Sequence, residues 1–266
     1  MTDMVKITSF DRTFTAGNGH TGPVLADITS PTGTVYVTAH PDALVATARV
    51  LTLDQPDSPA ATAVRNTRIE QTAGRLVVAV PRVPPAAHRS RGGTTVINGV
   101  HYSSSGSMTV VNGQVMGGVA QHTEHGVELH ITVPTGSDVR YRSESGSLHT
   151  FGTLAAIEAD SANGSVHAET VTRIQVSVDN GSVRVGRVTE SMHANASNGS
   201  VRVAEYAGSA CRVRAGNGSV DLTVDPAASG RLDIRAGNGS VLLRNVRHRT
   251  DLVVDAVAGI GAVRKS

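Results

Sequence analysis

Large aromatic side chains and cysteine are nearly absent from this chain of 266 residues. Tryptophan does not occur, and aromatic residues make up only 3% of the sequence. A core built around large rings is therefore not expected, and the many valines and alanines predict an interior of small and branched aliphatic side chains. The single cysteine, Cys211, excludes an intramolecular disulfide framework and a zinc site made of several cysteines.

Long hydrophobic runs are also missing. No apolar run approaches the roughly 18 residues that a membrane-spanning helix needs. The N-terminal stretch MTDMVKITSFDRTF lacks the apolar segment that secretory signals contain. These two absences lead us to expect a cytoplasmic protein with no membrane partner.

Lysine is scarce as well. Of the 24 cationic side chains, only Lys6 and Lys265 are lysines, so the remainder are arginines. Guanidinium groups bind carboxylate, phosphate or sulfate through two hydrogen bonds at once, which favours anionic partners. A GC-rich genome would produce the same bias. The formal net charge of +2 is too small to imply nucleic-acid binding by itself.

A repeated tetrapeptide, Asn-Gly-Ser-Val, dominates the second half of the chain. It occurs five times at spacings of 17, 18, 19 and 21 residues, and a degenerate copy, SGSL, begins at Ser145. We expect each Asn-Gly pair to form a corner at which the backbone takes positive φ. The candidate corner residues are Asn163, Gly164, Asn180, Gly181, Asn198, Gly199, Asn217, Gly218, Asn238 and Gly239.

Apolar and polar residues alternate strictly on both sides of each Asn. The column six residues before Asn, for example, contains Ile157, Ile174, Met192, Cys211 and Leu232. Alternation with period 2 predicts two half-buried strands per repeat. Separate antiparallel hairpins with Asn-Gly turns are one architecture that fits. The other architecture is an all-β, single-chain β-solenoid (β-helix) with rungs of about 18 residues. The constant character of each column favours this solenoid, and it predicts stacked asparagine amides along one corner.

The expected organisation has three parts. Residues 1–85 form an irregular β-rich N-terminal part, with strands near 43–53 and 75–80 and a corner-like Ser-Pro-Thr-Gly-Thr-Val within 25–38. A short helix is predicted over 58–67, with Ser58 as its N-cap and Pro59 at its first position. Residues 86–126 form a Gly/Ser-rich insert, read as hairpins or a mobile flap. Residues 127–266 form the solenoid, with 251–266 as its C-terminal cap.

The repeats resemble a known family. The segments SANGSVHA, DNGSVRV, SNGSVRV and GNGSVDL resemble the bacterial adhesin-like β-strand-repeat family of unknown function, in its actinobacterial form. The pieces INGVHY and VVNGQV resemble inserts of that family, and the resemblance covers roughly residues 25–250. It implies an adhesin-like β-helix. The family carries no established catalytic motif, so the resemblance supplies no active-site residues.

Arginines on the expected outer faces are the candidate anion-binding residues. They are Arg184, Arg202, Arg212, Arg214 and Arg235. Neighbouring rungs lie about 4.8 Å apart, so Arg184 should stack on Arg202 and Arg214 on Arg235. Such rows suit an acidic polysaccharide or a nucleic-acid backbone, although the lack of interleaved aromatics argues against single-stranded nucleic acid. The alternative is ordinary charged surface that discourages sheet aggregation.

Catalytic and metal-binding patterns are weak. His122 and His125, with His130 beyond them, converge on a metal only if a turn brings them together; otherwise they belong to a solvated loop. No Gly-x-Ser-x-Gly elbow occurs, and outward acids do not recur in stacked columns. We therefore predict a non-enzymatic scaffold or interaction protein without a cofactor, capable of self-association. The alternatives are binding of an anionic polymer and a β-helix enzyme acting on polysaccharides.

Overall fold

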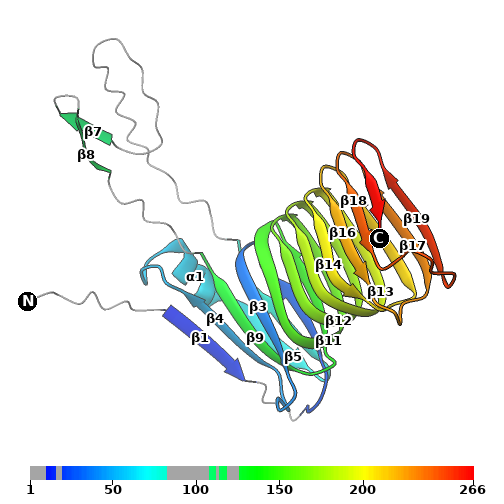
Figure 1. The fold of residues 1–266 in the computed structure, drawn as a ribbon. Helices are drawn as coiled ribbons and strands as arrows, with labels where there is room; N and C mark the ends of the chain where they lie inside the picture. Colours follow the sequence, from blue (N-terminus) through cyan, green and yellow to red (C-terminus); the bar gives the residue numbers. More distant parts are fainter. Residues whose placement is uncertain (1–9, 16–19, 83–107, 112–113, 119–125) are drawn as a thin grey trace, which may run out of the picture.

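The chain winds into a parallel β-solenoid of about seven turns, as the computed structural model shows (Figure 1). The structure describes residues 10–15, 20–82, 108–111, 114–118 and 126–266. The expected all-β coil is confirmed, with rungs of about 19 residues. Each strand of the repeats pairs in parallel with the strand one rung away, so equivalent residues of successive repeats lie side by side.

Two faces make up the coil. The first face contains, in spatial order, β9 (Glu128–Pro134), β3 (Thr32–His40), β11 (Ser145–Asn163), β12 (Val166–Asn180), β13 (Val183–Asn198), β14 (Val201–Tyr206), β16 (Val220–Val224), β18 (Val241–Arg244) and β20 (Val263–Lys265). The second face contains β6 (Arg75–Ala79), β2 (Leu25–Thr29), β10 (Asp138–Ser143), the C-terminal halves of β11 to β13, and then β15 (Ala210–Ala215), β17 (Gly230–Ala236) and β19 (Leu252–Ala258).

The interior follows the predicted apolar columns. One such column is the stack Val166, Val183, Val201, Val220 and Val241, all of them buried. Two aromatic rings also lie in this mainly aliphatic interior, because Tyr141 and Tyr206 are fully buried. Tyr141 has Ala159 as its neighbour on the next rung, and the small alanine leaves room for a ring.

The Asn-Gly corners are present, but the physical reason for their glycines differs from the expected one. None of the five Asn-Gly pairs has positive φ. A Cβ atom added to Gly199 would lie 1.6 Å from the carbonyl oxygen of Gly181 one rung away, and the other four repeat glycines meet the same obstacle at 1.8–2.1 Å. Glycine is thus required because successive corners stack too closely for any side chain, not because the backbone is left-handed.

Asparagine amides form the expected ladder along this corner. The Nδ2 group of Asn180 donates to Oδ1 of Asn163 at 2.9 Å, and Asn198 donates to Asn180 at 3.0 Å. Asn217 and Asn238 continue the ladder with bonds of 2.6 Å. Each amide therefore links its own rung to the preceding one, in the manner of the amide ladders of stacked β-structures.

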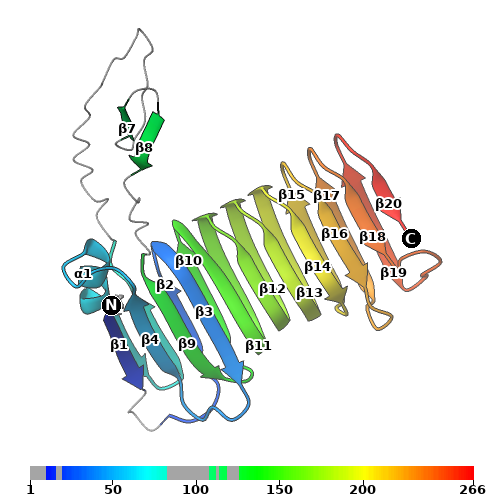
Figure 2. The same ribbon diagram turned by 60° about the vertical axis from the view of Figure 1, so that its left-hand side comes forward.

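The N-terminal strands close one end of the coil (Figure 2). Strand β4 (Thr47–Thr52) pairs antiparallel with β9 and with β1 (Phe10–Thr15), and β5 (Arg68–Thr72) pairs antiparallel with β6. The predicted helix is confirmed as α1 (Pro59–Asn66), whose N-cap Ser58 accepts a hydrogen bond from the amide of Ala61 at 3.0 Å. With eight residues it is far too short to span a bilayer, and no other described helix could do so.

The N-terminal part also contributes to the coil itself. Strands β2, β3 and β6 pair in parallel with the strands of the repeats, and Gly33 of the corner-like segment lies beside Gly146. Within the insert, β7 (Met108–Val111) and β8 (Gln114–Gly118) pair antiparallel as a small sheet of their own, and most of the remaining insert lies outside the described residues. The domain boundaries at residues 85 and 126 stay a prediction.

The C-terminal tail continues the coil. Residues 251–266 were expected to cap the last rung, but β19 and β20 pair in parallel with β17 and β18 as a further rung. The outer side of this rung pairs with no strand in the described part of the chain. Several of its apolar side chains are exposed, among them Val253, Val257, Ile260 and Val263.

Candidate functional site

The structure divides the five candidate arginines between the two faces. Arg184 and Arg202 are register partners on the first face. Arg214 and Arg235 are register partners on the second face, and Arg212 lies on the same strand as Arg214. Both expected stacks are therefore present, but they do not join into one stripe.

Carboxylates on the same rung or on the next one engage three of these arginines. Arg202 pairs with Asp221 at 3.2 Å on the first face. On the second face, Asp233 lies 3.7 Å from Arg212 and 3.0 Å from Arg235. In each pair the arginine is exposed and the aspartate is mostly buried, so the pair fixes the direction of the arginine side chain.

Arg184 and Arg214 differ from the other three. Both side chains are exposed, and neither has a carboxylate within ion-pairing distance among the residues that the structure describes. Each guanidinium therefore keeps its fork of N–H donors available to an external anion. If either face binds an anion, these two positions are the strongest candidates for the contact.

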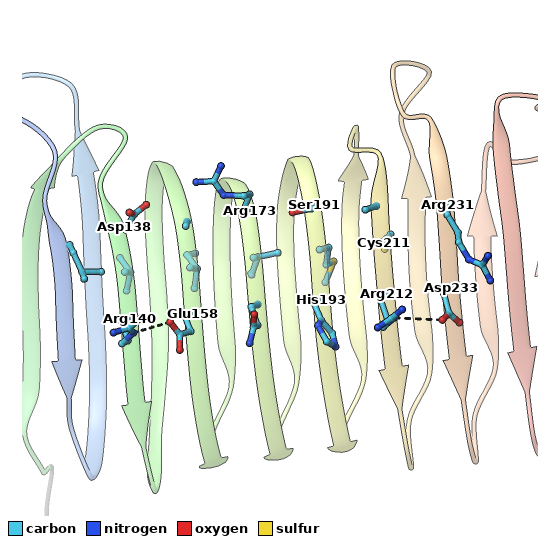
Figure 3. A pocket seen from close by; sticks show the side chains of 18 residues that line it. Asp138, Arg140, Glu158, Arg173, Ser191, His193, Cys211, Arg212, Arg231 and Asp233 are labelled. Carbon is cyan, nitrogen blue, oxygen red and sulfur yellow. Dashed lines mark hydrogen bonds and ion pairs between the residues drawn. The ribbon is translucent and has the colours of Figure 1, made fainter.

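A groove of about 630 Å³ runs across the second face, parallel to the coil axis (Figure 3). It crosses six neighbouring strands from β10 to β17, a span of about 24 Å at the usual strand spacing. Its floor is the backbone around Ile157, Met192 and Cys211, whose side chains are buried. The polar side chains along its two walls are Asp138, Arg173, Ser191 and Arg231 on one side, and Arg140, Glu158, Gln175, His193, Arg212 and Asp233 on the other.

Acidic and basic side chains alternate along this groove. Arg140 donates to Glu158 at 2.8 Å, and Arg212 faces Asp233, as the dashed lines in Figure 3 mark. Glycoside hydrolysis uses two carboxyl groups that flank one bond of the substrate. Here Glu158 and Asp233 are each engaged by arginine and lie on strands several rungs apart, so the groove offers a contact surface of mixed charge.

The histidine cluster falls largely outside the described residues, because His122 and His125 lie there. His130 is described: it is exposed on β9, with its Nε2 atom 3.5 Å from a carboxylate oxygen of Glu128. Within the described part of the chain, no group of three or more His, Cys, Asp or Glu side chains has a geometry that would hold a metal.

Sequence analysis missed a column of rings on the first face. His130 lies beside Tyr36 of β3, Tyr36 beside His149 of β11, and His149 beside His167 of β12. The ring centroids are 4.9, 5.4 and 4.9 Å apart, with the first two pairs stacked and the last edge-on. The next residue of the same column is Arg184. We call these four rings, followed by Arg184 and Arg202, the basic ladder.

Partial burial affects the two inner histidines of the basic ladder. It lowers the pKa of His149. Burial also lowers the pKa of His167, and the nearby charges of His149 and Arg184 lower it further. Both imidazoles therefore have a pKa below the ordinary histidine value and are mainly neutral at pH 7.

The fold defines the chain as a β-solenoid protein built from stacked repeats. The family model Toastrack DUF4097 matches residues 100–261, which is more than half of the chain. The chain therefore belongs to the Toastrack DUF4097 family. No protein of curated function matches it.

Several solved structures show some likeness to this chain. A candidate adhesin from Bacteroides fragilis has a TM-score of 0.48 at 11% identity, covering 98% of both chains. A candidate adhesin from Parabacteroides merdae has a TM-score of 0.44 at 8% identity, covering 97% of this chain and 96% of its own. A candidate lipid-binding protein from Parabacteroides distasonis has a TM-score of 0.44 at 10% identity, covering 96% of each chain.

Proposed function

We propose that this protein is a non-enzymatic, adhesin-like scaffold that assembles through its last rung. The observation that supports this proposal is the difference between the two ends of the coil. Helix α1 and the antiparallel strands β1, β4 and β5 cover the N-terminal end, whereas the outer side of β19 and β20 has no described strand against it. An unpaired parallel edge presents a row of backbone donors and acceptors to another chain.

Exposed apolar side chains add to this edge. Val253 and Val257 lie on the outer surface of β19, and Ile260 lies in the turn that follows. A second copy that pairs along the same rung would place a strand beside these side chains and reduce their exposure in both molecules, giving an interface with twofold symmetry. Such pairing would double the length of the rod and leave both long faces free.

Self-association is tested by replacing both valines with lysine. We expect the unmodified protein to show a molar mass that rises with concentration in light scattering, and the Val253→Lys, Val257→Lys variant to remain monomeric. Leu44→Lys is the matched control, because Leu44 is as exposed as Val253 (69% against 62%) but lies near the covered end. A protein that stays strictly monomeric at high concentration, or a Leu44 variant that dissociates equally, contradicts the proposal.

The absence of catalysis is part of the same proposal. It is supported by the pairing of Glu158 and Asp233, two of the three acids that line the groove, with arginines, so that no two of these acids are both free of an arginine to flank one substrate bond. A polysaccharide-active enzyme remains the alternative, and it requires such a pair. The cytoplasmic location and the actinobacterial form of the family stay predictions.

Binding of an anionic polymer is a second candidate function. The observation that favours it is the absence of a carboxylate partner at Arg184 and at Arg214 in the described structure. If one of these arginine rows binds a polyanion, reversing the charge of that row abolishes binding and its dependence on salt. The double variant for the first face is Arg184→Glu with Arg202→Glu, and the double variant for the second face is Arg214→Glu with Arg235→Glu. Affinity for a polyanion that survives both double variants contradicts this function.

A further inference from the structure

The basic ladder brings together side chains from distant parts of the sequence. Strand β3 lies between β9 and β11, so Tyr36 is placed between His130 and His149. The repeat strands then extend the same column through His167 and Arg184. The result is an unbroken row of six outward side chains, one per strand, parallel to the coil axis and about 24 Å long at the usual strand spacing.

Ring packing orders this row. Tyr36 is stacked against His130 on one side, at an interplanar angle of 22°, and against His149 on the other, at 28°. Because neighbouring rings cover its faces, the phenol directs its edge and its hydroxyl outward. His149 and His167 meet edge-on, at an interplanar angle of 89°. The ladder thus presents hydrogen-bond donors at regular intervals, with little side-chain freedom left to lose on binding.

Small side chains flank the arginine end of the ladder and leave it accessible. The column two residues before it contains serines, among them Ser165, Ser182 and Ser200. Beside Arg184 and Arg202 on the other side stand only Gly186 and Ala204. A hollow of about 310 Å³ lies next to the two inner histidines, lined by His149, Thr150, Phe151, His167, Ala168 and Glu169.

Fixed positive charge lies at one end of the ladder. Arg184 has no described carboxylate partner, while Arg202 shares Asp221 with Arg244. Each guanidinium can bind a carboxylate or sulfate through two parallel hydrogen bonds. The Tyr36 ring stacks on a neighbouring ring at each of its faces, so it offers no free face to a nucleobase. Binding of single-stranded nucleic acid would need such a free aromatic face.

We propose that the basic ladder binds an acidic polysaccharide that lies along the coil axis, and that protonation of its histidines strengthens the binding as the pH falls. The polymer's acidic groups contact Arg184 and Arg202, and its hydroxyl and acidic groups continue over His167 and His149. This inference rests on the second candidate function, assigns it to the first face and names its ligand. The extended form of the polymer matches a row whose groups repeat once per strand.

Titration of the inner histidines supplies the pH dependence. His149 and His167 are mainly neutral at pH 7, because burial lowers the pKa of each. The other groups that face them are Tyr36 of β3, Glu169 of β12 and Arg184 of β13. The Glu169 carboxylate accepts a hydrogen bond from the amide of Gly152 at 2.8 Å. On β9, one strand beyond Tyr36, His130 lies beside Glu128.

A bound anion favours the charged form of each imidazole it contacts, so the complex takes up protons. By linkage, affinity then rises as pH decreases, by at most about tenfold per pH unit for each histidine that takes up a proton. The arginines keep their charge throughout, so they supply the binding that remains at alkaline pH.

The test measures binding of polygalacturonate, a linear polyuronate, by isothermal titration calorimetry at low salt between pH 8 and pH 5. We expect the affinity of the unmodified protein to rise about tenfold or more between pH 7.5 and pH 5.5. His149→Gln with His167→Gln should keep the affinity measured at pH 7.5 but lose the rise. Arg184→Glu with Arg202→Glu should lose binding at every pH.

Matched controls lie on the second face. His193→Gln removes an exposed histidine there, and Arg214→Glu removes the other arginine that has no described acid partner; both should bind as the unmodified protein does. Circular dichroism verifies that each variant folds. Dextran, an uncharged polymer, should not bind.

Three outcomes overturn the inference. If the affinity does not change with pH, or if its rise persists in the double glutamine variant, the histidines do not cause the pH dependence. Binding by the arginines would still stand in that case. A single-stranded oligonucleotide that binds more tightly than polygalacturonate shows that the ligand class is wrong. No binding of any polyanion at any pH rejects both this inference and the second candidate function.

Discussion

Replacing Gly199 with alanine is expected to destabilise the coil severely. The new methyl group would lie 1.6 Å from the carbonyl oxygen of Gly181 and 2.6 Å from its carbonyl carbon. Both atoms belong to a backbone that hydrogen bonds and stacked corners hold in place, so neither can move without separating two rungs. We expect the free energy of unfolding to fall by more than about 4 kcal/mol, the range in which substitutions are exceptional and have one identifiable cause. Urea unfolding followed by far-ultraviolet circular dichroism measures the change.

Gly74 provides the matched control for this prediction. It has positive φ (+73°) in the turn between β5 and β6, and a Cβ atom there would meet nothing within 4 Å. Gly74→Ala should therefore cost only the backbone strain of a left-handed alanine, about 1–2 kcal/mol. The two variants separate close approach from backbone conformation. A Gly199 variant no less stable than the Gly74 variant contradicts the proposed role of the corner glycines.

Cys211 is expected to resist alkylation in the folded protein. Its side chain occupies the buried column between Met192 and Leu232. Burial raises the pKa of the thiol from its ordinary value to about 12, and the neighbouring Asp233 carboxylate adds to the rise. The thiolate is the reactive species, so at neutral pH its population falls by about a thousandfold relative to an ordinary cysteine. Iodoacetamide labelling followed by mass spectrometry should show at least this difference between native and denatured protein.

A cysteine at the preceding position distinguishes burial from other causes. Ala210 lies on the same strand with its side chain exposed. Ala210→Cys in the background of Cys211→Ala should react at the rate of an ordinary thiol. Rapid labelling of Cys211 in the native unmodified protein would show that the column opens to solvent, which is inconsistent with the packing described above.

The structure of the repeat region could be predicted in detail, because the residues close to each Asn determine which side chains face inward and which face outward. Alternation around each Asn placed Val183 and Val201 inside and Arg184 and Arg202 outside, and the structure agrees. The equal character of the columns also predicted the parallel register. The conformation of the corner glycines could not be predicted, because an Asn-Gly pair is equally compatible with positive φ and with close stacking.

Contacts between distant segments could not be predicted from the repeat. Tyr36 belongs to the basic ladder only because β3 lies between β9 and β11 in the sheet. This spatial order differs from the order of the strands along the chain, so the sequence did not predict it. The acids that pair with Arg202 and Arg212 could have been predicted from the repeat. Asp221 and Asp233 occupy the same columns as these arginines, one repeat later. Alignment of the repeats therefore contained the signal for those ion pairs, because each acid follows its arginine in the same column.

The rungs vary in length while their asparagine corner stays constant. The spacing of corner glycines grows from 17 residues between Gly164 and Gly181 to 21 between Gly218 and Gly239. The added residues lie at the opposite bend: β13 runs through it without a break, whereas residues 225–229 form a loop between β16 and β17. One edge of the rod is thus conserved in geometry and the other tolerates insertion. Evolution or protein engineering can lengthen loops along that second edge, and so change what the rod displays, without disturbing the stacking that holds it together.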